Sequence, residues 1–127
     1  DRLVLKNVEQ LLVPGGYLFL DLADADSLML PHERWWSELD GGYMLMEAWY
    51  DPATCIHHGQ FRYLDRDGRL NLCAEDERIR VYSLPELTAL LSEAGLPLEA
   101  AYGGFELPLE AYGPSHHERM LVVGRRP

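Results

Sequence analysis

Apolar residues at the start of the chain recur at helical spacing and are followed by a sequence that ends helices. Val4, Val8, Leu11 and Leu12 fall at helical spacing, which places them on one helical face. Pro14 cannot donate a main-chain hydrogen bond, and Gly15 and Gly16 tolerate the left-handed turn that follows many helices. The pattern predicts an amphipathic helix that ends before Pro14.

A short apolar strand is predicted directly after this helix, over residues 17–22. The side chains are apolar or aromatic until Asp21, with no alternation of polar residues before it. An unbroken apolar run of this length is typical of a strand that is buried on both faces, as in the parallel sheet of an α/β protein. We therefore expect a helix, a tight turn and a buried strand at the start of the chain.

The middle of the chain changes from an irregular segment to strands. Residues 23–41 show no clear period, and they have room for a short helix. Residues 43–82 alternate at strand spacing, with turn sequences at residues 51–54 and 65–68. They predict a three-stranded antiparallel meander. In a doubly wound fold such a meander must be an insertion.

A capped helix and two strands complete the predicted elements. Ser83 and Glu86 have the spacing of a capping box, in which the serine oxygen accepts a hydrogen bond from the main-chain N–H of the glutamate. Leucines at helical spacing follow until Gly95, a residue type that commonly ends helices. Apolar runs at residues 98–102 and 119–124 predict the last two strands.

Two of these stretches resemble class I S-adenosylmethionine (SAM)-dependent methyltransferases. The run Leu12-Val-Pro-Gly-Gly16, with the helix before it and the apolar strand after it, is similar to the family's "L-x-P-G-G" motif and fifth strand. The run Arg80-Val-Tyr82 and the helix from Glu86 are similar to the "R-x-Y" strand and "E-L-x-x-L-L-x-x-A-G" helix of small-molecule methyltransferases. The resemblance spans nearly the whole chain but only the carboxyl-terminal half of the family's fold.

The resemblance implies an α/β fold, namely the C-terminal part of a Rossmann-like SAM methyltransferase fold with an inserted three-stranded antiparallel sheet. Residues 1–22 and 83–127 would form the Rossmann-like part, and residues 23–82 an inserted lid that shapes the acceptor pocket. The glycine-rich loop that holds SAM in this family does not occur in the sequence, which starts at Asp1 close to a helix. We therefore expect a fragment that is inactive alone and whose missing N-terminal half binds most of the SAM.

Three candidate substrate-binding residues lie at or before the insertion. Asp21 ends the first strand at the edge where open α/β sheets bind ligands, so it orients or deprotonates an acceptor, or else caps the following turn. Trp35 and Trp36 open the insertion. They form a wall for an apolar or cationic acceptor, or they pin the loop to the sheet.

Two further candidates, Arg80 and Tyr82, alternate on the strand before the capped helix and are expected to share a face. Arg80 can pair with a carboxylate or phosphate of the substrate, or with a carboxylate of the missing half. The alternative is a salt bridge within the chain. Its possible partners are Glu47, Glu75 and Glu77.

Charge and composition exclude several classes of partner. The formal net charge of -10 disfavours nucleic acid, and no apolar run approaches the roughly 20 residues that span a membrane. Cys55 and Cys73 are too few for a disulfide framework, and although a bridge can form if their strands pair, we expect buried free thiols and a cytoplasmic protein. Adjacent His57 and His58 point to opposite faces of a strand, and no zinc-ligand spacing occurs, so no metal site is expected.

The function expected from the resemblance is methyl transfer from SAM to a small molecule, because an acidic chain with a short lid offers little docking surface for a macromolecule. The alternative is a non-catalytic binding or dimerisation module. Without the N-terminal half, the strand at residues 17–22 would leave one edge unpaired. A homodimer through this open edge is therefore expected for the isolated chain.

Overall fold

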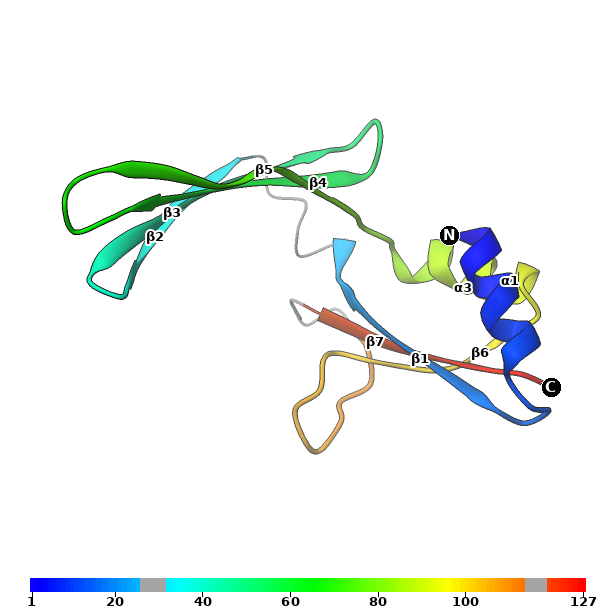
Figure 1. Cartoon of the computed structure of the whole chain (residues 1–127). Helices are drawn as coiled ribbons and strands as arrows, with labels where there is room; N and C mark the ends of the chain where they lie inside the picture. Colours follow the sequence, from blue (N-terminus) through cyan, green and yellow to red (C-terminus); the bar gives the residue numbers. More distant parts are fainter. Residues whose placement is uncertain (26–31, 114–118) are drawn as a thin grey trace. The chain divides into compact units, whose positions relative to one another are not determined.

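The computed structural model describes residues 1–25, 32–113 and 119–127, and the chain divides into two compact units (Figure 1). The first unit comprises Asp1–Ser27 and Tyr82–Pro127, and the second comprises Leu28–Val81. The sequence placed these boundaries at residues 22/23 and 82/83.

The first unit is built on a three-stranded sheet with the order β1-β7-β6 (Figure 1). The central strand β7 (Arg119–Arg125) pairs antiparallel with β1 (Tyr17–Ala23) on one side and with β6 (Leu98–Tyr102) on the other. In the described part of the chain, β1 is therefore an edge strand with one unpaired side. The open edge expected from the sequence is present.

The expectation that the first strand is buried on both faces is wrong. Exposure alternates along β1, with Tyr17 and Phe19 exposed and Leu18 and Leu20 half-buried. The half-buried leucines pack against the core cluster of the unit. The other face carries the exposed rings of Tyr17 and Phe19, so an unbroken apolar run in the sequence did not mean burial on both faces of the strand.

Two helices, α1 (Arg2–Leu11) and α3 (Leu84–Glu93), form the core with one face of the sheet. The predicted apolar face of α1 is only partly correct, because Val4 and Leu11 are exposed. Leu5 is buried instead. The stripe that packs inward follows the i, i+3, i+7 pattern. The buried cluster consists of Leu5, Tyr82, Leu87, Leu91, Leu96, Met120 and Val122.

The capped start and the end of α3 are confirmed. The main-chain N–H of Glu86 donates to Ser83 Oγ at 3.4 Å, which satisfies one of the free N–H groups of the first turn. After the helix, Gly95 has a φ of 82°, and the next N–H, from Leu96, donates to Leu91 O. A side chain at Gly95 would be strained in this left-handed conformation.

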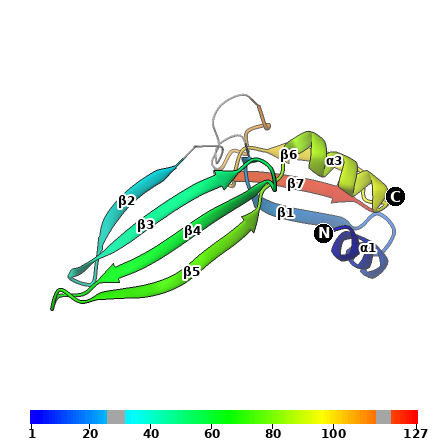
Figure 2. The same cartoon turned by 90° about the horizontal axis from the view of Figure 1, so that it is seen from above.

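The second unit is a four-stranded antiparallel sheet with the order β2-β3-β4-β5 (Figure 2). The sequence had predicted three strands and an irregular segment over residues 23–41, and this was wrong for β2. The four strands are β2 (Glu33–Leu39), β3 (Gly42–Asp51), β4 (Ile56–Leu64) and β5 (Leu70–Arg80).

A two-residue hairpin turn accounts for the extra strand. Leu39 pairs with Gly42, and the residues between them, Asp40 and Gly41, have positive φ values of 49° and 75°. An Asp-Gly pair in this conformation matches the twist of two antiparallel strands and is a strong hairpin signal. No strand was predicted before this turn, because residues 23–41 show no clear period in the sequence.

The other predicted turns of the second unit are confirmed. The carboxylate of Asp51 accepts hydrogen bonds from Ala53 N and Thr54 Oγ1, and Gly68 N donates to Asp65 O in the last hairpin. The register of β4 and β5 shifts between Gly59 and Phe61 and again between Phe61 and Arg62.

Both cysteines are free thiols, as expected, but neither is fully buried. Cys55 is half-buried, and Cys73 is exposed.

Candidate functional site

Asp21 forms an ion pair with Arg119 on the surface of the first unit. Arg119 Nε and Nη2 donate to the two carboxylate oxygens of Asp21 at 2.7 and 2.6 Å. These hydrogen bonds and the charge of Asp21 raise the pKa of the Arg119 guanidinium. The two side chains come from β1 and β7, so the pair links adjacent strands. A role of Asp21 toward an acceptor stays a prediction.

A second acidic residue, Asp24, lies buried just beyond the carboxyl end of β1. Its exposed fraction is 4%, and Tyr112 Oη donates to its two carboxylate oxygens at 3.1 and 3.0 Å. Asp24 also forms an isolated parallel bridge with Tyr82. Three segments that are distant in sequence therefore meet at the sheet edge where open α/β folds bind ligands.

Asp24 is not among the site residues predicted from the sequence. One feature of the sequence could have pointed to it: Asp24 follows the strand directly and lies between two alanines, whose small side chains let other segments approach closely. Its tyrosine partner lies 88 positions away, and no local pattern predicts such a contact.

Arg80 and Tyr82 fall on opposite sides of the boundary between the two units. Tyr82 is a buried member of the core cluster of the first unit. Arg80 ends β5, and its Nη1 donates to the main-chain oxygens of Cys55 at 3.3 Å and Val81 at 3.0 Å. The described contacts give both residues a structural role, and substrate binding by them stays a prediction.

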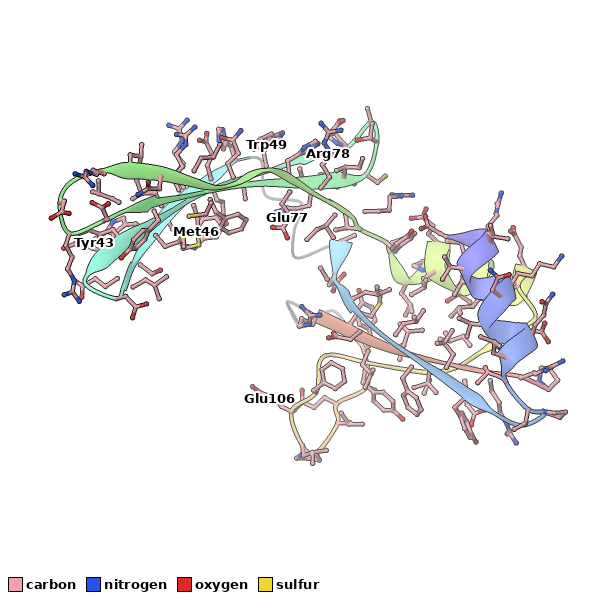
Figure 3. All side chains as sticks on the ribbon, in the orientation of Figure 1. Tyr43, Met46, Trp49, Glu77, Arg78 and Glu106 are labelled. Carbon is pink, nitrogen blue, oxygen red and sulfur yellow. The ribbon has the colours of Figure 1, made fainter. Side chains whose placement is uncertain are left out.

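The second unit has two chemically different faces. Figure 3 shows Trp49 and Arg78 on one side of the ribbon and Met46 and Glu77 on the other. Side chains alternate along each strand, so the residues that share a face with Trp49 follow from the register. We call this side the polar face. From β2 to β4 it carries Arg34, Trp36, Glu38, Tyr43, Leu45, Glu47, Trp49, Asp51, Ile56, His58, Gln60, Arg62 and Leu64.

Glu47 is the electrostatic centre of the polar face. Arg34 Nη2 donates to Glu47 Oε1 at 2.8 Å, and His32 Nε2 lies 2.7 Å from the same oxygen. The hydrogen bonds from Arg34 and then His32 hold the pKa of the Glu47 carboxyl below its usual value. Beside this cluster, the rings of Trp49 and His58 stack at 5.0 Å with an angle of 2°.

On the other side of β4, burial lowers the pKa of the His57 imidazole. Protonated His57 is therefore disfavoured near neutral pH, in contrast to the exposed charges of the polar face.

Trp35 and Trp36 are both exposed, with exposed fractions of 44% and 63%. The ring of Trp36 contacts Tyr43 edge to face at a centroid distance of 5.4 Å. Both tryptophans line a cavity of about 400 Å³. The remaining lining residues are Arg34, Leu45, Met46, Glu47, Gln60 and Arg62.

A second depression of similar size lies beside this cavity and shares Glu47 and Gln60 with it. Its other lining residues are His32 and Trp49. The predicted contact of Trp35 and Trp36 with an acceptor stays a prediction, but the structure places both at a cavity of ligand size.

The described residues do not fit a SAM cradle of the glycine-rich type. In that arrangement, glycines join the carboxyl end of a strand to the start of a helix. The glycines with left-handed φ values occupy other positions, at helix ends, hairpin turns and the loop after β6. They are Gly15, Gly41, Gly68, Gly95 and Gly104.

Two absences concern only the described part of the chain. It contains no group of three residues arranged to hold a metal ion, and no helix that is long and apolar enough to cross a membrane. The adjacent histidines His116 and His117 lie outside the described residues.

Comparison with known proteins identifies the fold. No family model matches the chain, and no curated protein sequence matches it. Solved structures do match. The CcbJ methyltransferase from Streptomyces caelestis is 22% identical, with a TM-score of 0.82, over 97% of this chain and 51% of its own.

Two further structures agree. A SAM-dependent methyltransferase from Clostridium acetobutylicum is 16% identical, with a TM-score of 0.80, over 98% of this chain and 50% of its own. CalS10, a SAM-bound amino pentose methyltransferase from Micromonospora echinaspora, is 15% identical, with a TM-score of 0.61, over 99% of this chain and 50% of its own.

This chain therefore has the fold of part of a SAM-dependent methyltransferase and spans about half the length of the structures that it matches. The predicted resemblance and the α/β fold class are confirmed at this level.

Proposed function

We propose that this chain is the carboxyl-terminal portion of a SAM-dependent methyltransferase that acts on a small molecule. The observation that carries the proposal is the combination of the β1-β7-β6 sheet with an antiparallel sheet inserted between β1 and α3. This combination matches methyltransferases over almost all of the chain but over half of theirs. In the proposal, SAM is held mainly by residues that precede Asp1 in the complete protein.

A small-molecule acceptor is supported by charge and by similarity. The net charge of -10 opposes binding to nucleic acid. The similar structure CalS10 methylates an amino pentose. Amino pentoses are therefore the first acceptor class to assay, by transfer of a labelled methyl group from SAM.

Calorimetric titration of SAM tests where the cofactor binds. SAM is titrated into the 127-residue chain and, separately, into a longer polypeptide that includes the segment preceding Asp1 in the parent protein. We expect heat only with the longer polypeptide. Tight binding to the 127-residue chain would contradict the proposed cofactor location, and no binding to either would contradict the methyltransferase proposal.

The second candidate function is a non-catalytic binding or dimerisation module. The unpaired edge of β1 and the exposed rings of Tyr17 and Phe19 favour it, because an open strand edge can pair with another chain. SAM binding by the longer polypeptide, followed by methyl transfer, would argue against this alternative. An upstream segment with no affinity for SAM would favour it.

A further inference from the structure

Among the described residues, one guanidinium group in the cavity beside Trp36 has no acidic partner. The register places Trp36, Leu45 and Arg62 opposite one another on β2, β3 and β4, so these three side chains form one row across the polar face. The neighbouring row consists of Arg34, Glu47 and Gln60. All six residues line the cavity of about 400 Å³.

The charges of the two rows do not cancel. Arg34 and His32 already bind the carboxylate of Glu47, and the described lining residues include no second acidic side chain. Arg62 Nη2 donates to Gln60 Oε1 at 3.3 Å, a neutral acceptor. Among the described residues Arg62 has no carboxylate within ion-pair distance, so the cavity contains an uncompensated positive charge within a chain that is acidic as a whole.

The apolar part of the cavity offers a flat surface beside this charge. The indole of Trp36 is 63% exposed and is held from one side by the ring of Tyr43. Leu45 lies between Trp36 and Arg62 in the row. An aromatic ring gains contact area and stacking energy against such a surface, and a cavity of this size accommodates a small molecule.

We propose that this cavity binds a small aromatic acid. Its ring packs against Trp36 and Leu45, and its carboxylate accepts hydrogen bonds from the Arg62 guanidinium, whose planar fork matches a carboxylate. The amide of Gln60, whose oxygen already accepts from Arg62, provides an NH₂ donor for the second carboxylate oxygen. The proposal goes beyond the proposed function, because this binding requires neither SAM nor methyl transfer.

Two matched probes separate the charge from the ring. They are 2-naphthoate, which has the ring and the carboxylate, and 2-naphthamide, which has the same ring without the charge. Each is titrated into ¹⁵N-labelled chain while the indole N–H signals are followed by NMR. All three tryptophans of the protein lie on this sheet, so the indole signals report on it alone. We expect saturable shifts of the Trp36 signal and about tenfold tighter binding of the acid.

Variants locate the interaction. Arg62→Gln should weaken naphthoate binding about tenfold and leave naphthamide binding unchanged, whereas Arg62→Lys should keep part of the preference for the acid. Trp36→Leu should weaken both probes. The control is Arg69→Gln, because Arg69 is an exposed arginine next to the last hairpin turn and is not part of the lining. It should bind both probes as the wild type does.

Three results would overturn the proposal: no saturable shift of the Trp36 signal, equal affinity for acid and amide, or equal effects of Arg62→Gln and Arg69→Gln. The amide spectrum of each variant shows directly whether it is folded. Because no SAM is present, failure of this experiment leaves the methyltransferase proposal untouched, and failure of the SAM titration leaves this one untouched.

Discussion

The hydrogen bonds between Tyr112 and Asp24 join the loop after β6 to the end of β1. Asp24 is almost fully buried, so its carboxylate depends on protein donors rather than on water. Tyr112→Phe removes one such donor and should lower the free energy of unfolding by about 1–2 kcal/mol. Urea denaturation followed by circular dichroism measures this change.

A matched tyrosine is available as a control. Tyr17 Oη lies 3.5 Å from Glu99 Oε1 on the surface, where water can replace the hydrogen bond. Tyr17→Phe should therefore change the free energy of unfolding by less than about 0.5 kcal/mol. Equal effects of the two substitutions would show that burial of Asp24 does not strengthen its dependence on Tyr112.

Glu47 provides a pH-dependent test of the polar face. Its folded-state pKa lies below the usual 4.5, so the stabilisation from its partners is fully present above pH 4.5 and is lost as the pH falls through the folded pKa. In a ¹³C NMR titration of the Glu47 carboxyl, Arg34→Gln should move the midpoint upward, because it removes the main cause of the shift. An unchanged midpoint would contradict the role of Arg34, and Arg69→Gln is the control that should have no effect.

At the scale of elements, the start of α3 depends on one serine. Ser83→Ala removes the oxygen that accepts from Glu86 N and should destabilise the protein by about 1 kcal/mol. Ser92, in the last turn of the same helix, is exposed and makes no cap, so Ser92→Ala should have an effect below about 0.5 kcal/mol. Thermal unfolding of the two variants compares them directly, and similar melting temperatures would show that the cap contributes little.

The elements that the sequence predicted correctly are those with local signals. Ser83, Gly95 and the Asp65–Gly68 turn act through hydrogen bonds or φ values within a few residues, and each was placed correctly. The burial of β1 and the existence of β2 depend on which elements pack or pair with them. Periodicity over a few residues does not contain this information.

The residues of the candidate site differ in the same way, between those with a local sequence signal and those that depend on distant contacts. From the sequence we selected Trp35 and Trp36, which line a cavity, and Asp21, which is engaged by Arg119. Substrate binding by these three residues stays a prediction. We missed Asp24, whose burial requires a contact from a distant segment. We also missed Arg62, which among the described residues donates only to the neutral acceptor Gln60 and has no acidic partner.

At the scale of the whole molecule, the unpaired edge of β1 determines how the isolated chain should behave in solution. A strand edge with free main-chain N–H and C=O groups can pair with a second copy. The exposed fraction of Phe19 on this strand is 63%, and the exposed rings of β1 add apolar area to such an interface. We therefore propose that the 127-residue chain self-associates through β1.

Light scattering and sedimentation at micromolar concentration test this proposal. Phe19→Lys should raise the dissociation constant at least about tenfold, because a charged side chain on an edge strand opposes pairing and apolar burial. Leu107→Lys is the control, since Leu107 is exposed and belongs to the loop after β6 rather than to the strand β1. A wild-type chain that stays monomeric, or equal effects of both lysines, would show that the edge is not an interface. Loss of self-association when the segment preceding Asp1 is attached would instead indicate that this segment covers β1 in the complete protein.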